Sequence, residues 1–177
     1  MKKTILGAVL GATAMLSGTT AMADGHGEIT VAYFLEWPMP MMAAKAAGTY
    51  DEALGMKVNW VSFETGVAMS AAMASGDVQI ALSQGLPPFV VAASGGQDIQ
   101  VVDVAVSYAE NQGCAVHSDL EIDLASASEL AGKKVAVPLG TAAHYSFIRQ
   151  MDHFGVPLDS LSIVDMPPPE GANALGQ

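Results

Sequence analysis

Short apolar runs alternate with alanine-rich stretches of helical spacing from residue 28 to the end of the chain. The runs are rich in β-branched residues and each is only a few residues long. This βαβα alternation is typical of a mostly parallel sheet that is covered by helices on both faces. The chain is therefore predicted to have an α/β fold.

The first part of the chain is predicted to form one full lobe. Its predicted strands cover residues 29–34, 57–63, 78–83 and 99–106, and its predicted helices cover residues 39–47, 66–74 and 87–94. Glycine follows each predicted helix, and glycine is the residue that most often ends a helix. We place this lobe at residues 24–107.

A second unit is predicted to begin at residue 108. Its predicted strands cover residues 114–117, 134–138 and 162–165, and its predicted helices cover residues 126–131, 141–154 and 168–175. In the first lobe the helix that ends at Gly76 runs straight into a strand, whereas the matching helix here is followed only by Gly176 and Gln177. A parallel sheet without its next strand has an unpaired edge. We therefore expect residues 108–177 to be a partial second lobe, without its remainder and without the return to the first lobe.

The first 23 residues have the three zones of a secretory signal peptide. Lys2 and Lys3 are basic, residues 5–16 form an apolar run, and Ala21-Met22-Ala23 is a small-x-small cleavage site. The apolar run is too short to cross about 30 Å of hydrocarbon. Residues 1–23 are therefore predicted to be removed on export, which predicts a periplasmic location for the remaining chain.

The charge of the chain restricts its partners. The formal net charge is −11, and without Lys2 and Lys3 it becomes −13. Nucleic acid is therefore not expected as a partner, because nucleic-acid binding depends on basic surfaces. Such acidity keeps a protein soluble and monomeric. Since Cys114 is the single cysteine, no intramolecular disulfide can form, and stability must come from apolar packing.

No catalytic motif is present in the sequence. It lacks a nucleophile elbow, a Walker loop and an HExxH pair, and its four histidines are scattered. We therefore expect neither an enzyme nor a cofactor. Cleavage after Ala23 would leave Asp24-Gly25-His26 at the new N-terminus, a sequence that can bind Cu(II) or Ni(II) through four nitrogens in a square plane. We regard that metal site as incidental chemistry.

Three stretches carry a resemblance to a known family. They are Val-Ala-Tyr-Phe at 31–34 with Glu36-Trp37-Pro38, Ala-Ala-Met-Ala-Ser-Gly-Asp-Val-Gln-Ile at 71–80, and Leu-Ala-Gly-Lys-Lys-Val-Ala-Val-Pro-Leu-Gly-Thr at 130–141. The chain resembles the taurine, aliphatic-sulfonate and nitrate branch of ABC-transporter solute-binding proteins over nearly all of residues 28–175. The resemblance implies a two-lobed periplasmic-binding-protein fold that closes over one ligand. It also implies a C-terminally truncated fragment, because members of the family carry a whole second lobe.

Ligands of open α/β sheets bind beyond the carboxyl ends of the strands, where helix N-termini present free N–H groups. Glu36 and Trp37 follow the first strand and offer a carboxylate for an amine and an indole for a wall or a cation–π contact. They can equally be a loop carboxylate and a half-buried tryptophan. Ser83 and Gln84 follow the third strand, where their polar groups can reach either a helix cap or a ligand.

Residues 139–145 are the strongest candidate for an anion site. Small residues there let backbone N–H groups of a strand-to-helix turn approach a sulfonate, which makes Gly140, Thr141, Ala142 and His144 candidate ligand-binding residues. Thr141 can instead be only an N-cap, and His144 only a surface residue. Family position adds Tyr108 and Asn111 as cleft residues at the crossing between the lobes.

The resemblance implies the binding component of an ABC importer, which delivers a small sulfonate-like solute to a permease in the inner membrane. A carboxylate at Glu36 that faces the helix start near Thr141 would suit a zwitterion, so taurine is the predicted ligand. Two alternatives remain open. The scaffold can serve a pyrimidine or thiamine-precursor binder or an enzyme, or the chain can be a truncated fragment without a function of its own.

Overall fold

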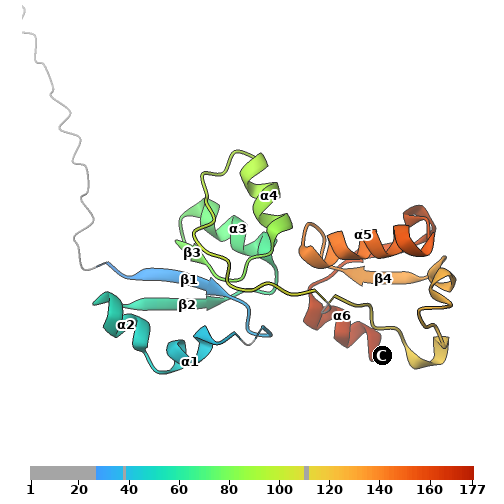
Figure 1. Cartoon of the computed structure of the whole chain (residues 1–177), viewed down its shortest axis with the longest axis horizontal. Helices are drawn as coiled ribbons and strands as arrows, with labels where there is room; N and C mark the ends of the chain where they lie inside the picture. Colours follow the sequence, from blue (N-terminus) through green and yellow to red (C-terminus); the bar gives the residue numbers. More distant parts are fainter. Residues whose placement is uncertain (1–26, 38, 110–111) are drawn as a thin grey trace, which may run out of the picture.

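The computed structural model describes residues 27–37, 39–109 and 112–177, which form two α/β units joined by a long crossing segment (Figure 1). The predicted signal peptide and Asp24-Gly25-His26 lie outside the described residues. In chain order the first unit comprises β1 (Ile29–Tyr33), α1 (Met41–Ala46), α2 (Thr49–Leu54), β2 (Val58–Ser62), α3 (Gly66–Ser75), β3 (Ile80–Ala81) and α4 (Leu86–Ser94).

The second unit begins with two 3-10 helices. Its elements are η1 (Ser118–Leu120), η2 (Ala127–Leu130), β4 (Lys134–Val137), α5 (Ala142–Phe154), η3 (Leu158–Ser160), β5 (Ser162–Asp165) and α6 (Pro168–Leu175). Within the described parts of the chain, no helix combines the length and the apolar character that a membrane crossing requires.

All strand pairs in the described residues are parallel, which confirms the predicted α/β class. The first sheet has the order β2-β1-β3 and the second pairs β4 with β5. Ile29 lies opposite Val58 in the first sheet, and Lys134 lies opposite Ser162 in the second. Because every parallel pair needs a crossover, helices lie on both faces of both sheets.

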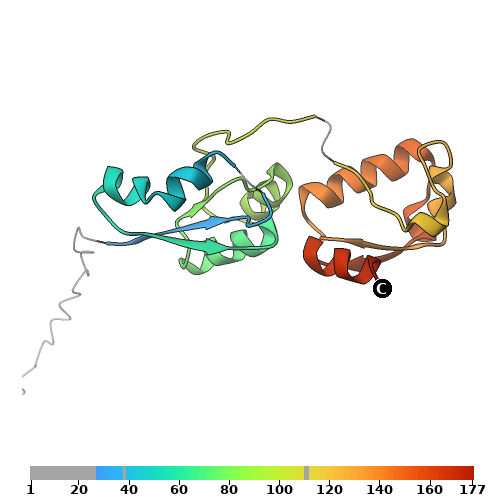
Figure 2. The same cartoon turned by 90° about the horizontal axis from the view of Figure 1, so that it is seen from below.

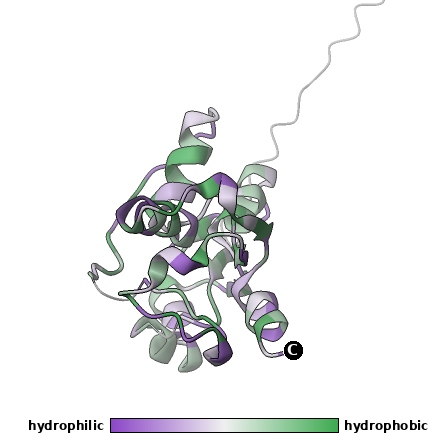
Figure 3. Ribbon diagram, turned by 90° about the vertical axis from the view of Figure 1, so that its right-hand side faces the viewer, coloured by the Kyte–Doolittle hydropathy of each residue, from purple (hydrophilic) through white to green (hydrophobic). Residues whose placement is uncertain are grey.

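Each sheet lies between two helical layers (Figures 1 and 2). Helices α3 and α4 cover one face of the first sheet, and α1 and α2 cover the other; α5 and α6 lie on opposite faces of the second sheet. Hydrophobic and hydrophilic segments both occur along the ribbon (Figure 3), but α3 and α4 contain no charged residue.

Two separate hydrophobic cores hold these layers together. Ala32 of β1 and Met69 of α3 are fully buried in the first unit. In the second unit, Phe147 and Met151 lie one turn apart on α5 and pack beneath it with Val137 of β4. Each core is therefore formed mainly between one strand and one helix, β1 with α3 and β4 with α5.

Helix α2 was not expected from the sequence, where Gly48 was interpreted only as the end of a helix. Gly48 and Gly55 both have positive φ, at 68° and 62°, and they bound this short helix on both sides. Neither α1 nor α2 contains a buried residue. An aromatic cluster holds them on the sheet instead: the Lys45 ammonium lies 4.7 Å from the centroid of the Tyr33 ring, and the rings of Tyr50 and Trp60 are 5.4 Å apart.

Two predicted strands are wrong. Residues 99–106 and 114–117 form no strand in the structure, although their β-branched composition favours one. Val102 and Val104 are 83% and 72% exposed, so the first of these segments is neither paired nor covered. A strand is stabilised by its ladder and by packing on its face. Composition alone cannot supply those partners.

The remaining predicted elements occur at their predicted positions, although β3 is shorter than the predicted strand at 78–83, and η1 and η3 were not predicted. Strand β5 has the predicted bounds, and α3 and α5 differ from their predicted bounds by one residue. The predicted helix at 126–131 is a 3-10 helix, η2. Glycine ends α3 and α5, because Gly76 and Gly155 adopt φ of 86° and 68°.

Truncation of Met151 tests the second core. Met151 is 1% exposed, so Met151→Ala leaves a cavity beneath α5 and is expected to lower the free energy of unfolding by about 2–5 kcal/mol. Val102→Ala is the control, because Val102 is 83% exposed and its loss should change stability by less than about 0.5 kcal/mol. Urea unfolding followed by circular dichroism measures both, and equal effects would contradict the assigned core.

Candidate functional site

The N-termini of α3 and α4 meet at a point of very close approach. An added Cβ at Gly66, the first residue of α3, would lie 2.7 Å from Cγ of Pro88 in the first turn of α4. The side-chain amide of Gln84 strengthens this contact by donating to the carbonyl oxygen of Gly66 at 2.8 Å and to the hydroxyl of Ser70. The absence of a side chain at residue 66 is therefore what allows the two helix starts to touch.

Helix α5 of the second unit brings its N-terminus to the same place (Figure 1). An added Cβ at Gly85, the N-cap of α4, would lie 3.2 Å from Cβ of Ala142 in α5. An added Cβ at Gly140 would lie 3.2 Å from Cγ2 of Val67 in α3. Three helix starts thus converge where the two units touch, with one glycine at each of the three contacts.

Threonine side chains cap two of the three helices. The Thr65 hydroxyl accepts the N–H of Ala68 at 3.2 Å. The Thr141 hydroxyl accepts the N–H of His144 at 3.3 Å and donates to the carbonyl oxygen of Pro138 at 2.6 Å. Thr141 is therefore an N-cap, as one interpretation of the sequence had it, and both hydrogen-bonding roles of its hydroxyl are in use.

The turn before α5 also has its first N–H groups occupied. The N–H of Leu139 donates to Oδ1 of Asp165 at 2.9 Å, and the N–H of Gly140 donates to Nδ1 of His144 at 3.2 Å. Ala142 and Ala143 follow as the first two residues of the helix, where N–H groups have no partner within the helix. These two N–H groups are the donors that α5 presents at the convergence.

Helix α4 contributes fewer donors. Pro87 and Pro88 occupy its first turn and have no N–H, so Leu86 carries the first backbone donor of the helix. The N-cap of α4 is Gly85, and no side chain caps it. The interpretation of Ser83 as a helix cap is therefore wrong, because the N-cap position of α4 is two residues further along the chain, at Gly85.

The convergence is positively polarised. A helix N-terminus carries about half a positive charge. The first turns of α3, α4 and α5 contain no acidic residue, although the chain has 18 of them. By contrast, Asp51 and Glu52 lie in the first turn of α2 and Glu170 in that of α6. No carboxylate in the first turn of α3, α4 or α5 therefore offsets the partial positive charge of these helix ends.

Ser83 lies beside this convergence in a strained conformation. Its φ of 60° is in the left-handed region, which costs a residue with a Cβ about 1–2 kcal/mol. Its hydroxyl oxygen is buried and has no hydrogen-bond partner within the described residues. Strain and an unpaired buried hydroxyl together are typical of a ligand contact.

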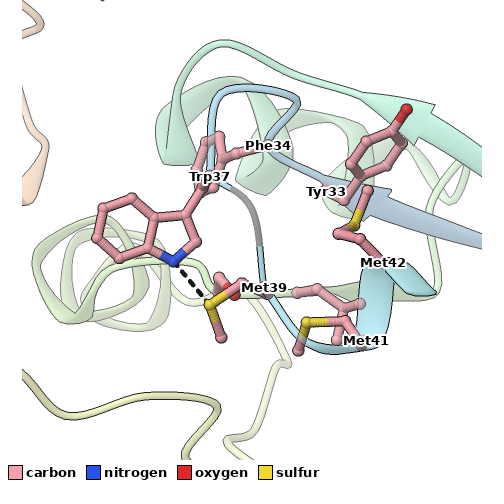
Figure 4. Close-up of a pocket in the computed structure, with 8 residues that line it drawn as sticks. Tyr33, Phe34, Trp37, Met39, Met41 and Met42 are labelled. Carbon is pink, nitrogen blue, oxygen red and sulfur yellow. Dashed lines mark hydrogen bonds between the residues drawn. The ribbon is translucent and has the colours of Figure 1, made fainter. Parts of the chain in front are cut away.

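A small pocket extends from Ser83 toward the loop that follows β1 (Figure 4). Aromatic, methionine and leucine side chains line the rest of it: Tyr33, Phe34, Trp37, Met39, Met41, Met42 and Leu82. The indole N–H of Trp37 donates to Sδ of Met39 at 2.8 Å. The Trp37 ring also packs against Tyr108, with centroids 5.6 Å apart and planes inclined by 52°. Among the described residues, no carboxylate lines this pocket.

The structure thus brings several predicted site residues together and leaves others apart. Trp37 and Tyr108 contact each other, Ser83 lines the pocket, and Gly140 and Ala142 lie at the convergence. The Gln84 amide group is held by α3, and the Glu36 side chain is on an exposed turn. Asn111 lies outside the described residues.

Sequence reasoning missed the start of α3. Thr65 and Gly66 follow β2 and open α3 by the same strand-to-helix rule that selected the turn before α5. The strand-to-helix pattern at Thr65 and Gly66 could have been recognised in the sequence, whereas the contact of Gly66 with α4 could not. Among residues 27–37, 39–109 and 112–177, no group of three or more histidine, cysteine or acidic side chains is placed to hold a metal ion.

Comparison with known proteins identifies relatives of the chain. Residues 27–161 match the family described as the substrate binding domain of the ABC-type glycine betaine transport system. The taurine-binding periplasmic protein of Escherichia coli (strain K12) is 33% identical over 141 residues, which are 80% of this chain and 42% of that protein.

Two solved structures share the fold. The periplasmic aliphatic sulphonate binding protein of Escherichia coli has a TM-score of 0.57 at 23% identity, over 85% of this chain and 50% of that chain. The alkanesulfonate-binding protein of Xanthomonas axonopodis pv. citri bound to MOPS has a TM-score of 0.61 at 17% identity, over 83% of this chain and 50% of that chain. The chain thus spans half or less of the length of these relatives.

A pair of glycine substitutions tests the contact between α3 and α4. Alanine favours a helix over glycine by about 1 kcal/mol, yet Gly66→Ala should destabilise by about 1–3 kcal/mol because its Cβ meets the rigid ring of Pro88 at 2.7 Å. Gly171→Ala in α6 should stabilise, since its Cβ would lie an ordinary 3.5 Å from Ala136. Urea unfolding measures both, and stabilisation by both would show that α3 and α4 do not approach as described.

Proposed function

Because this chain belongs to the family of substrate-binding domains of ABC-type transport systems, we propose that it forms the ligand-binding part of a transport protein for a small organic sulfonate. Taurine is the first ligand to test, since the relative that is 33% identical is named as a taurine-binding periplasmic protein. The proposed role is capture and delivery rather than catalysis.

The single observation that carries this proposal is the convergence of three helix N-termini without acidic first-turn residues. N–H donors and positive helix ends together favour an anion. A sulfonate offers three acceptor oxygens, which suits donors arriving from α3 and α5 on different sides. We place the sulfonate group at this convergence, with the N–H groups of Ala142 and Ala143 among its donors.

The other end of the ligand is proposed to lie against Trp37 and Tyr108 at the mouth of the pocket, whose interior of about 10 Å³ is the size of one water molecule. The aromatic and methionine lining of the pocket favours an alkyl chain, and the face of an indole also attracts an ammonium group. Glu36 does not line this pocket, but it precedes Trp37 on the same exposed turn and is the carboxylate nearest to the pocket in sequence. We propose that Glu36 pairs with the amine of taurine.

The same lining supports a second candidate ligand. A methylated ammonium joined to a carboxylate would place its anion at the helix starts and its methyl groups against Trp37 and Tyr108. The matched family is described by glycine betaine transport. Nitrate, by contrast, would occupy the anion position and leave the apolar pocket unused.

The cellular role follows from the same proposal. We propose that the protein works in the periplasm, as the name of its Escherichia coli relative suggests, and as a monomer that delivers its ligand to an ABC permease in the inner membrane. The negative charge of the chain gives no reason to expect a nucleic-acid partner.

Removal of a single backbone donor tests the anion position. Thr141 has a ψ of 174°, which suits a residue before proline, and proline is favoured at the first position of a helix. Ala142→Pro should therefore keep α5 while removing one N–H from the sulfonate. The expected loss is about 1.5–3 kcal/mol of binding free energy, roughly 10- to 100-fold in affinity.

Isothermal titration with taurine measures this loss, and Ala142→Ser, which keeps the N–H, is the control. Both variants should unfold at denaturant concentrations close to that of the unchanged protein. Equal affinity of the two variants would place the sulfonate elsewhere. Absence of binding by the unchanged protein to taurine, ethanesulfonate and glycine betaine alike would overturn the proposed ligand class.

A ligand pair tests the role of Glu36. Ethanesulfonate is taurine without its amine, so only taurine can use the Glu36 carboxylate. Glu36→Gln should weaken the binding free energy of taurine by about 1–2 kcal/mol and leave that of ethanesulfonate unchanged, because the amide removes the charge of the side chain but keeps its shape. Equal weakening of both ligands, measured by calorimetry, would exclude Glu36 as the partner of the amine.

A further inference from the structure

His144 lies at the proposed anion site, and its hydrogen bond with Gly140 depends on its protonation state. Its Nδ1 accepts the N–H of Gly140 at 3.2 Å. A ring nitrogen accepts a hydrogen bond only when it carries no proton, so this hydrogen bond requires the imidazole form with its proton on Nε2. Gly140 itself lies at the contact between the two units, where its Cα faces Val67 at the start of α3.

Protonation of Nδ1 would reverse this arrangement. The imidazolium ring has two donors and no acceptor, so it cannot keep the hydrogen bond from Gly140. The Gly140 N–H would be released at the edge of the convergence, and a full positive charge would be added to the first turn of α5. Without an anion this charge opposes the positive helix end. With an anion present, both changes favour binding.

We propose that His144 is a proton-linked specificity residue of the anion site, which when neutral withholds the Gly140 N–H from the ligand and when protonated releases it. This inference rests on the proposed function, since it places the anion at the start of α5. Histidine is the side chain whose charge ordinarily changes between pH 5 and 8. By linkage, a ligand that prefers the protonated form takes up a proton on binding, and its affinity rises as the pH falls.

The ionisable residues around His144 come from its own helix and from four neighbouring segments. Helices α3 and α4 contain no ionisable residue. Those on the other neighbouring segments are Glu64 before α3, Lys134 at the start of β4, Asp165 at the end of β5, Glu170 on α6, and Tyr145, Arg149 and Asp152 on α5. The Asp165 carboxylate is occupied by the N–H of Leu139, the residue before Gly140. It fixes the neighbouring turn and leaves the Gly140 N–H to His144.

The remaining described histidines provide controls. His153 lies in the last turn of α5, where its ring packs against Phe154, nine residues and roughly 13 Å along the helix from His144. His117 lies beside Asp119, with Nδ1 and Oδ2 3.5 Å apart. Neither ring contacts the turn before α5, so their protonation should leave the Gly140 N–H in place.

Calorimetric titration with taurine between pH 5.5 and 7.5 tests the inference. The affinity should rise by up to about tenfold per pH unit as the pH falls, with uptake of up to one proton. Titration in two buffers of different ionisation enthalpy measures that uptake. His144→Gln should abolish both effects, since its amide oxygen can accept from Gly140 but does not titrate, whereas His153→Gln should keep them. A flat profile of the unchanged protein, or a slope retained in His144→Gln, would overturn the inference.

A ligand-free measurement separates this inference from the proposed function. The amide proton resonance of Gly140 should shift during the titration of His144 in nitrogen-15 NMR spectra, because the same hydrogen bond breaks. If taurine gives no heat but this coupled shift appears, the hydrogen-bond switch is supported and the proposed ligand is wrong. If the Gly140 resonance does not follow His144, the switch is wrong whether or not taurine binds.

Discussion

The close approach of three positively polarised helix ends is the constraint on which the other features depend. Their partial charges repel one another, and the first turns of α3, α4 and α5 contain no carboxylate that would offset the repulsion. Glycine at residues 66, 85 and 140 nevertheless permits contacts that any Cβ would crowd. The arrangement therefore favours an anionic group between the helices, and the strained Ser83 beside them is consistent with a site that is completed by its ligand.

The two hydrophobic cores hold these helix ends in position. Met69 fixes α3 on the first sheet, and Met151 with Phe147 fixes α5 on the second. Met69 is the fourth residue of α3, whereas Phe147 and Met151 lie in the middle and later turns of α5. Thr65 and Thr141 accept the N–H groups of Ala68 and His144, so the N–H groups of residues 66–67 and 142–143 are the ones without a capping side chain.

The sequence predicted the parts of this arrangement that depend on local periodicity. Strands β1 and β5, helices α3 and α5, and the glycines that end those helices follow from residue spacing and backbone preference. Residues 99–106 were wrongly predicted as a strand, because pairing partners are a property of the fold and not of composition. The contact between Gly66 and Pro88 joins segments that are separate in the sequence, so no local pattern predicts it. The interaction of His144 with Gly140 likewise depends on the orientation of one ring.

The two prolines at the start of α4 determine which helices can donate hydrogen bonds at the convergence. They leave α4 with few N–H donors in its first turn, whereas the first turns of α3 and α5 contain no proline. In the proposed binding mode, an anion bound by both units would link them, and its affinity would depend on the angle between the units. A change of that angle imposed on the protein would then change the lifetime of the bound ligand.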